Sequence, residues 1–181
     1  MRISKVTTKS GDRGKTSLGN GERVSKSHLI INLLGDIDEL NSQIGSAISS
    51  CKSSLISSEL QSIQQDLFNI GGELSIPDVE MNLLKNSRIT WLEQSTNEYN
   101  QMLSPMKEFI LPGGTELSSR LHIVRAECRS AERKIVSLSK VEYVPKEHLK
   151  YLNRLSDYLF TLARIDMKKS GTSELSWDYK K

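Results

Sequence analysis

The chain has 181 residues, of which 26% are charged and 36% hydrophobic, and its formal net charge is +3. Such a chain is most simply one soluble, helix-rich globular domain with a sizeable core. The small positive charge, without a block of Lys and Arg, argues against a nucleic-acid partner. No apolar run is long enough to predict a membrane span.

The expected compartment of this protein is the cytoplasm. The first ten residues contain Arg2, Lys5 and Lys9 but no apolar segment, so no signal peptide is predicted. The two cysteines, Cys51 and Cys128, lie far apart and form no C-x-x-C pair, so we expect both to stay reduced.

Residues 1–27 are predicted to form a loop, because glycines alternate there with hydroxyl and cationic side chains. Such a loop can present backbone N–H groups to phosphate oxygens, although it could also be a tail without a binding role. Gly14-Lys15-Thr16 looks like half of a P-loop. That motif requires a glycine where this chain has Lys9, and no buried strand precedes it. A P-loop nucleotide fold is therefore rejected.

Residues 28–50 have the apolar spacing of a helix. Asp36, Asp38 and Glu39 are acidic neighbours in this otherwise apolar segment. Asp38 could pair with an arginine of this chain or of another subunit, or it could lie on a solvent-exposed face of the helix.

Two more helices are predicted before the middle of the chain. One follows the Ser-rich link 52–58 and is ended by Pro77, and the other spans about residues 87–103. The sequence FILPGG at 109–114 must then be a loop. Phe109 is therefore either a core residue or an apolar wall against a flat ligand.

The stretch from Arg120 to Leu138 is the clearest helix of the chain. Its apolar residues recur every three or four positions and form one seam: Leu121, Val124, Cys128, Ala131, Ile135 and Leu138. Arg125, Arg129, Glu132 and Arg133, which we call the arginine stripe, lie about 110° around the helix from that seam. Clustered guanidiniums repel one another unless an anion lies among them, so the stripe suits a polyphosphate. The alternative is a solvated face with i,i+4 pairs.

The last helix starts near Pro145 and carries Asn153, Asp157 and Arg164 together, away from its apolar seam. Five helices with short links predict an all-α, five-helix up-and-down bundle.

We expect one domain, 1–181, made of the loop 1–27, the bundle 28–168 and a tail 169–181. No E-x-x-H pair occurs, and the three histidines lack ligand spacing, so no metal site built from protein side chains is predicted.

Four patterns occur in fixed order: TKSGDRGKTS with GERVSK, DELNS, FILPGG, and LHIVRAECRSAER followed by YLNRLSDYLF. Together they closely resemble the ATP:cob(I)alamin adenosyltransferases of the propanediol-utilisation type, over about residues 5–164. The resemblance implies a five-helix homotrimer with active sites between subunits. It also implies transfer of the 5′-deoxyadenosyl group of ATP to cob(I)alamin, which forms adenosylcobalamin and releases triphosphate.

The resemblance also implies roles for individual residues. The residues expected to wrap the ATP triphosphate are Thr8, Lys9, Ser10, Gly11, Thr16, Ser17 and Lys26. The helical side of the nucleotide site would be completed by Arg129, Glu132, Arg133 and Asn153, with Mg²⁺ carried on the phosphates. Arg125 would lie at the same interface with Asp38 as its acidic partner, and Phe109 would face the corrinoid. The residues expected to take part in catalysis are Arg125, Arg129, Glu132 and Phe109.

The chain departs from the family pattern at Ser130, where the family often has a second arginine. Arg129 and Arg133 keep their places. The expected partners, besides ATP and the corrinoid, are a reductase that supplies Co(I) and a cobalamin-dependent enzyme that receives the product. A rival hypothesis is a non-catalytic helical oligomer that binds ATP or another polyphosphate.

Overall fold

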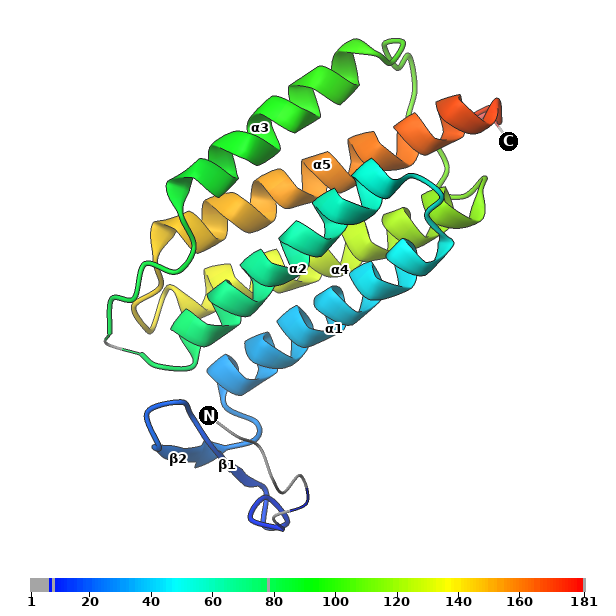
Figure 1. Ribbon diagram of the computed structural model, residues 1–181. Helices are drawn as coiled ribbons and strands as arrows, with labels where there is room; N and C mark the ends of the chain where they lie inside the picture. The colour runs from blue at the N-terminus through cyan, green and yellow to red at the C-terminus, as the bar shows by residue number, and fades with distance from the viewer. Residues whose placement is uncertain (1–6, 8, 78, 181) are drawn as a thin grey trace.

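The computed structural model describes residue 7, residues 9–77 and residues 79–180. Its elements are two short strands and five helices: β1 (Lys15–Ser17), β2 (Arg23–Ser25), α1 (Leu29–Ser50), α2 (Ser54–Leu74), α3 (Asn86–Gln101), α4 (Glu116–Leu138) and α5 (Lys146–Ser170). Figure 1 shows the helices side by side in one bundle, with both strands beyond one end of it. The predicted all-α, five-helix bundle is confirmed.

Helix α4 is the central helix of this bundle. It packs against both α1 and α5, while α1 also packs against α2 and α5 against α3. Consecutive helices run in opposite directions, as an up-and-down bundle requires, and residues 102–115 carry the chain from α3 across to α4 (Figure 1).

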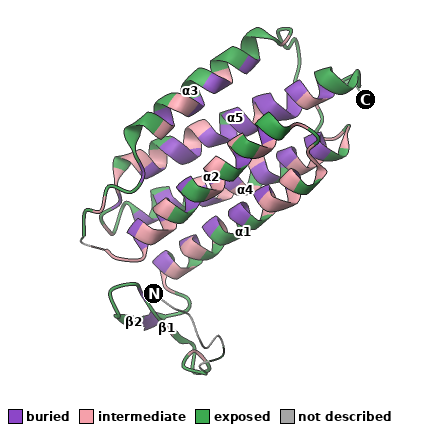
Figure 2. Cartoon of the chain, viewed as in Figure 1, coloured by how far each residue is buried: buried purple, intermediate pink, exposed green. Residues whose placement is uncertain are grey.

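The apolar seam predicted on α4 forms the middle of the core. All six of its residues are buried: Leu121, Val124, Cys128, Ala131, Ile135 and Leu138. In Figure 2 the buried residues of the helices face the neighbouring helices, and the exposed residues face outward. Full burial of a large apolar side chain contributes about 1.5–3 kcal/mol. The seam therefore determines which face of α4 stays exposed at the surface of the bundle.

Two buried or partly buried carboxylates fasten α2 to the rest of the bundle. Asp66 accepts a hydrogen bond from Arg88 Nε of α3 at 2.8 Å and from the Tyr151 hydroxyl of α5 at 2.7 Å. Glu59, two turns earlier on α2, accepts one from the Tyr158 hydroxyl of α5 at 2.9 Å. These charged contacts link α2 to α3 and α5.

The N-terminal segment is more regular than the sequence indicated, because β1 and β2 pair as an antiparallel hairpin. Strands of three residues are too short to show the alternation that predicts a strand. The Gly19 N–H donates to the Ser75 carbonyl at the end of α2, at 2.7 Å. A β-carbon on Gly19 would lie only 2.7 Å from the Ile76 side chain, so this close approach requires glycine. The hairpin is thereby fixed against the end of α2.

Replacing Asp66 by Ala should lower the free energy of unfolding by about 3–5 kcal/mol, because Arg88 and Tyr151 would lose their acceptor. Urea denaturation followed by circular dichroism measures this loss. The control is Glu116→Ala, which removes an exposed i,i+4 pair with Arg120 and should cost less than about 1 kcal/mol. Equal effects of the two substitutions would contradict the prediction.

Candidate functional site

The arginine stripe lies on the part of α4 that borders α5 and solvent. Asn153 of α5 donates through Nδ2 to Glu132 Oε1 at 2.8 Å, so these two predicted residues do meet. Arg129 and Arg133 are exposed, whereas Arg125 is half-buried. None of the ion pairs formed among the described residues involves Arg129 or Arg133. Their guanidiniums are therefore available to bind an anion from outside the chain.

Arg125 and His122 both lie against the ring of Phe160 on α5. The Arg125 Cζ atom is 5.9 Å from the centroid of that ring, within the range of a cation–π contact, and the His122 ring meets it edge-on at 6.1 Å. Burial lowers the pKa of Arg125, and positive Arg129 adds to the effect. Among the described atoms, Arg125 Nε and His122 Nδ1 are buried without a hydrogen-bond partner. Such groups require a partner, which a ligand or another chain can supply.

Asp157 and Phe160 extend this surface along α5, and the sequence analysis gave neither of them a role. Burial raises the pKa of the Asp157 carboxyl; Arg154 opposes the shift, Glu132 adds to it, and Arg129 again opposes it. The sequence did contain a signal for them: Asp157 follows Asn153 by four residues and Phe160 follows Asp157 by three, a spacing that places all three on one face of a helix. The surface is thus built from one face of α4 and one face of α5.

The segment before the hairpin folds into a tight turn. Lys9 has a left-handed φ of 59°, and Gly14 has one of 73°. The Gly14 N–H donates to the Gly11 carbonyl at 3.2 Å. A β-carbon on Gly11 would lie 3.0 Å from Lys26 Nζ, so the missing side chain makes room for this ammonium group. The turn therefore brings predicted phosphate-binding residues together.

Arg23 organises this turn, although sequence reasoning did not single it out. Its Nη2 donates to the Ser10 carbonyl at 2.8 Å, and its Nη1 donates to the Ser17 hydroxyl at 3.3 Å. Thr16 lies beside Ser17 on β1, opposite Val24. The predicted residue Thr8 lies outside the described residues.

The hairpin and the arginine stripe are separate within one chain. Figure 1 shows the hairpin beyond the start of α1, whereas the stripe occupies residues 125–133 of α4. No hydrogen bond or ion pair among the described residues joins them. The two predicted halves of the nucleotide site are therefore not brought together by a single copy of the chain.

Phe109 is not a core residue, because 75% of its surface is exposed. The C-terminal tail runs back alongside it: Trp177 N–H donates to the Phe109 carbonyl at 2.7 Å, and Leu111 N–H donates to the Leu175 carbonyl at 2.7 Å. The Phe109 and Trp177 rings lie 6.5 Å apart. The sequence analysis left residues 169–181 without a role, although Leu175, Trp177 and Tyr179 alternate with polar residues as in a strand.

A buried ion pair anchors this tail. Helix α5 extends to Ser170, slightly past the predicted boundary at residue 168, and Gly171 ends it with a left-handed φ of 70°. Arg164, which is 7% exposed, then donates to both carboxylate oxygens of Glu174, at 2.9 and 3.2 Å. Arg164 also donates to the Ser104 carbonyl at 3.0 Å. The tail and the α3–α4 connection are therefore held to the same residue.

Asp38 has no ion-pair partner among the described residues. It lies in a groove between α1 and α2, next to Phe68. Its neighbour Asp36 pairs instead with Lys134 of α4, at 2.6 Å. The predicted pairing of Asp38 with Arg125 is therefore not made inside one chain, and it stays a prediction for contacts between copies.

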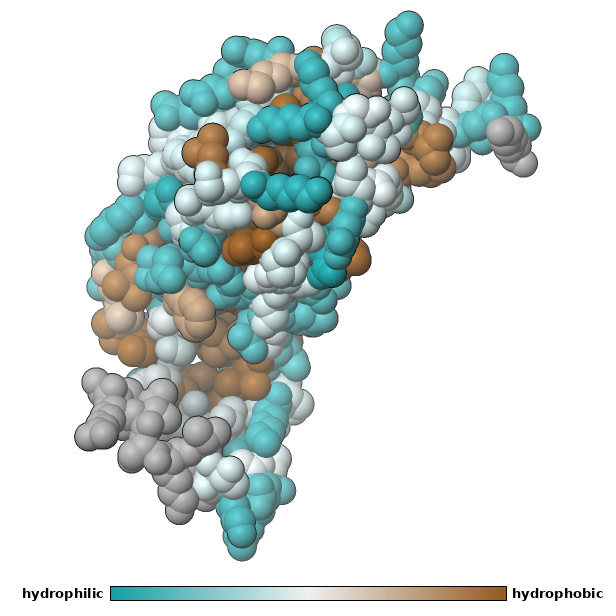
Figure 3. Space-filling model, turned by 45° about the vertical axis from the view of Figure 1, so that its right-hand side comes forward, coloured by the Kyte–Doolittle hydropathy of each residue, from teal (hydrophilic) through white to brown (hydrophobic). Residues whose placement is uncertain are grey.

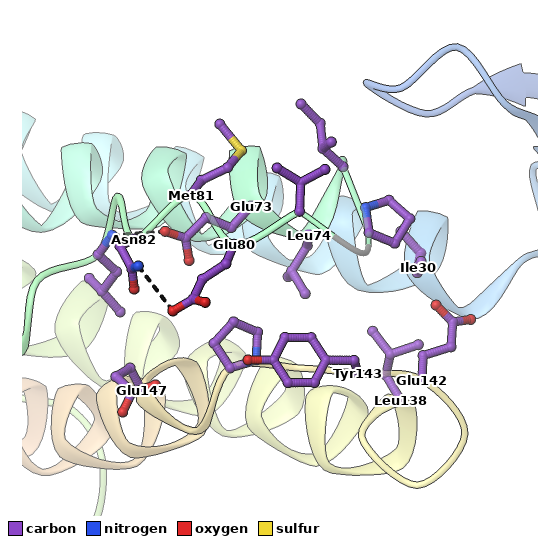
Figure 4. Close-up of a pocket in the computed structure, with 15 residues that line it drawn as sticks. Ile30, Glu73, Leu74, Glu80, Met81, Asn82, Leu138, Glu142, Tyr143 and Glu147 are labelled. Carbon is purple, nitrogen blue, oxygen red and sulfur yellow. Dashed lines mark hydrogen bonds between the residues drawn. The ribbon is translucent and has the colours of Figure 1, made fainter.

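A small cavity of about 60 Å³ lies at the hairpin end of the bundle (Figure 4). Carboxylates dominate its polar lining: Glu73, Glu80, Glu142 and Glu147. Glu80 accepts a hydrogen bond from the Asn82 amide at 3.1 Å, and Glu73 binds the Leu84 N–H at 3.2 Å. Acidic groups repel a polyphosphate, and none of the predicted site residues lines this cavity. It is not a candidate for the nucleotide site.

Among the described residues, no group of three His, Cys, Asp or Glu side chains is placed to hold a metal ion. Nor is any described helix both long and apolar enough to cross a bilayer.

The fold and the site together define a class: a helical bundle with a row of arginines on α4 beside α5 and a glycine-rich turn ahead of the first helix. Residues 6–166 match the model of the cobalamin adenosyltransferase family. The chain belongs to that family.

Individual relatives agree with the family match. The cobalamin adenosyltransferase of Cupriavidus metallidurans is 44% identical over 97% of this chain and 95% of its own length. The human corrinoid adenosyltransferase MMAB is 41% identical over 96% of this chain and 73% of its own length. A phenylalanine-to-alanine variant of the PduO-type ATP:corrinoid adenosyltransferase from Lactobacillus reuteri, complexed with cobalamin and ATP, superposes with a TM-score of 0.92. It is 35% identical and covers 96% of this chain and 99% of its own.

Acidification should destabilise this protein in part through His122. Burial lowers the pKa of His122, Arg125 lowers it further, and Glu174 opposes the shift. The unfolded chain therefore binds a proton at this histidine more readily than the folded chain. The stability that His122 contributes is fully present above the ordinary histidine pKa and is lost as the pH falls from there through the lowered pKa of the folded state. Urea unfolding at about pH 7.5 and about pH 5 should show a smaller loss for His122→Gln than for the wild type. Identical losses would contradict this.

Proposed function

We propose that this chain transfers the 5′-deoxyadenosyl group of ATP to cob(I)alamin. Co(I) attacks C5′ of the ribose, the bond from C5′ to the triphosphate oxygen breaks, and a cobalt–carbon bond forms. Because the corrinoid supplies the nucleophile, the protein needs no Ser, Cys or His nucleophile of its own. The observation that carries the proposal is that two exposed arginines, Arg129 and Arg133, form no ion pair with any described residue and lie near the Glu132–Asn153 hydrogen bond.

The triphosphate would be held from two directions. The turn that contains Lys9, Ser10 and Gly11 offers backbone N–H groups, with the Lys26 ammonium beside it. The hydroxyls of Thr16 and Ser17, and that of Thr8 by resemblance, would add hydrogen bonds. Mg²⁺ would enter with the nucleotide, carried on its phosphates. Arg129 and Arg133 would then stabilise the negative charge that gathers on the departing triphosphate.

Phe109 would form an apolar wall below the corrinoid. Its exposed ring, backed by Trp177, supports this role because it leaves an aromatic face uncovered next to the bundle. An apolar wall keeps water and the corrinoid's own nitrogen ligand away from the cobalt. Loss of that axial donor makes Co(II) easier to reduce, since axial ligation controls the redox potential.

The active sites would lie between subunits of a homotrimer. The separation of the hairpin from the arginine stripe in one chain supports this arrangement, because a second copy could bring the two together. Arg125 Nε has no hydrogen-bond partner among the described atoms, and Asp38 has no ion-pair partner among the described residues. The two would then pair across the interface. Hydrophobic patches on the surface, brown in Figure 3, and exposed apolar side chains such as Phe68 and Leu55 offer area for such contacts.

The protein would work in the cytoplasm with two partners. A reductase would deliver the electron that converts Co(II) to Co(I). A cobalamin-dependent enzyme would receive the adenosylated product.

Anaerobic reduction of cobalamin, with and without protein and Mg-ATP, tests the function directly. The absorbance band of cob(I)alamin should disappear only when protein and ATP are both present, and a light-sensitive adenosylated corrinoid should form. ATP binding without conversion would instead favour the non-catalytic polyphosphate-binding oligomer.

Arg129→Ala should reduce kcat by about 100-fold or more, because Arg129 would face the charge that develops on the triphosphate. Steady-state adenosylation kinetics measure the effect. Lys134→Ala is the matched control, since it removes a cation of the same helix that is already paired with Asp36. Near-normal kinetics for Arg129→Ala would place the stripe on a merely solvated surface.

Phe109→Ala should slow adenosylation that starts from cob(II)alamin by at least about tenfold, because the lower face of the cobalt would no longer be kept dry. The rate with fully pre-reduced cob(I)alamin should fall much less. Tyr143→Ala, an equally exposed aromatic at the α4–α5 connection, serves as the control. An unchanged rate from cob(II)alamin would disprove the role of Phe109.

A further inference from the structure

The carboxamide of Asn153 is held at both of its ends. Its Nδ2 donates to Glu132 Oε1 at 2.8 Å, while its Oδ1 accepts from Arg154 Nη1 at 2.6 Å. Arg154 in turn donates through Nε to Glu93 Oε1 of α3 at 2.9 Å. One continuous hydrogen-bonded chain therefore runs from α3, through two residues of α5, to α4.

The chemistry of the two neighbours determines how the amide of Asn153 is turned. A guanidinium can only donate hydrogen bonds, and a carboxylate can only accept them. Arg154 must therefore bind the amide oxygen, and Glu132 must bind the amide nitrogen. Rotation of the amide by 180° would place donor against donor and acceptor against acceptor, so only one orientation satisfies both neighbours.

Stability is a poor explanation for the outer part of this chain. The side chains of Arg154 and Glu93 are 42% and 49% exposed. Ion pairs with this exposure contribute about 0–1 kcal/mol. Arg154 instead sets the direction of the Asn153 amide. Setting a direction needs a definite geometry but little binding energy.

We propose that Arg154 is a positioning residue for the nucleotide, acting through Asn153 on Glu132. This inference rests on the proposed function, which places Asn153 and Glu132 at the ATP. Arg154 fixes the amide so that its nitrogen faces Glu132, and that hydrogen bond fixes the carboxylate of Glu132 within the arginine stripe. Glu93 keeps the guanidinium in place from the other side.

The space around Arg154 explains why it needs the outer contact with Glu93. A hollow of about 260 Å³ opens between α3 and α5, lined by Glu93, Thr96, Asn97, Asn100, Arg154 and Asp157. Without Glu93, the guanidinium could turn into this hollow and leave the amide oxygen. Loss of Glu93 should therefore produce a weaker form of the same defect.

Arg154→Met tests the proposal, because methionine keeps an unbranched stem but has no donor. The KM for ATP should rise by about tenfold, the loss expected for one charge-assisted hydrogen bond. The KM for cob(I)alamin should stay within about twofold. Glu93→Gln should raise the KM for ATP by a smaller factor. Arg120→Met, at the beginning of α4, is the control for removing a partly exposed arginine.

A double variant separates positioning from a general structural role. If Arg154 acts through Asn153, Arg154→Met adds nothing to the defect of Asn153→Ala, so the double variant should match Asn153→Ala alone. Multiplying effects, an unchanged KM for ATP in Arg154→Met, or equal increases for both substrates would overturn the proposal. An inactive wild-type protein would refute the proposed function itself, which is a different result.

Discussion

The burial of α4 between α1 and α5 is the packing interaction on which the rest of the structure depends. Contacts with α1 and α5 cover its apolar seam, so that seam can carry no polar group. The functional side chains must then use the face that remains, at the border with α5. This explains why the arginine stripe meets Asn153 and Phe160 of α5 on the side of the bundle and not in its interior.

Much of this could be read from the sequence, because helices long enough to show their periodicity reveal both faces. The seam of α4 was predicted residue by residue, and its geometry placed the stripe to one side of the core. The choice between Asp36 and Asp38 could not be made in the same way. Both lie on α1 within one turn, and only the approach of Lys134 from α4 shows that Asp36 is the paired one.

The hairpin and the tail were missed for a different reason. Their positions on the bundle depend on contacts between residues far apart in the chain, such as Gly19 with Ser75 and Phe109 with Trp177. Three-residue strands and a single bridge carry almost no local signal. The motifs indicated that the N-terminal loop suits phosphate, but they could not indicate that Arg23 holds it in shape.

The C-terminal tail follows the last helix and pairs with the segment before α4, so its loss would change the protein without removing a helix. A chain that stopped at Ser170 would keep the residues of all five helices and of the α4 seam, so its circular dichroism spectrum should still be helical. It would lack Glu174 and Trp177, and with them the backing of Phe109. It would also leave the buried guanidinium of Arg164 without its carboxylate partner, so the truncated molecule should stay helical but unfold at a lower denaturant concentration.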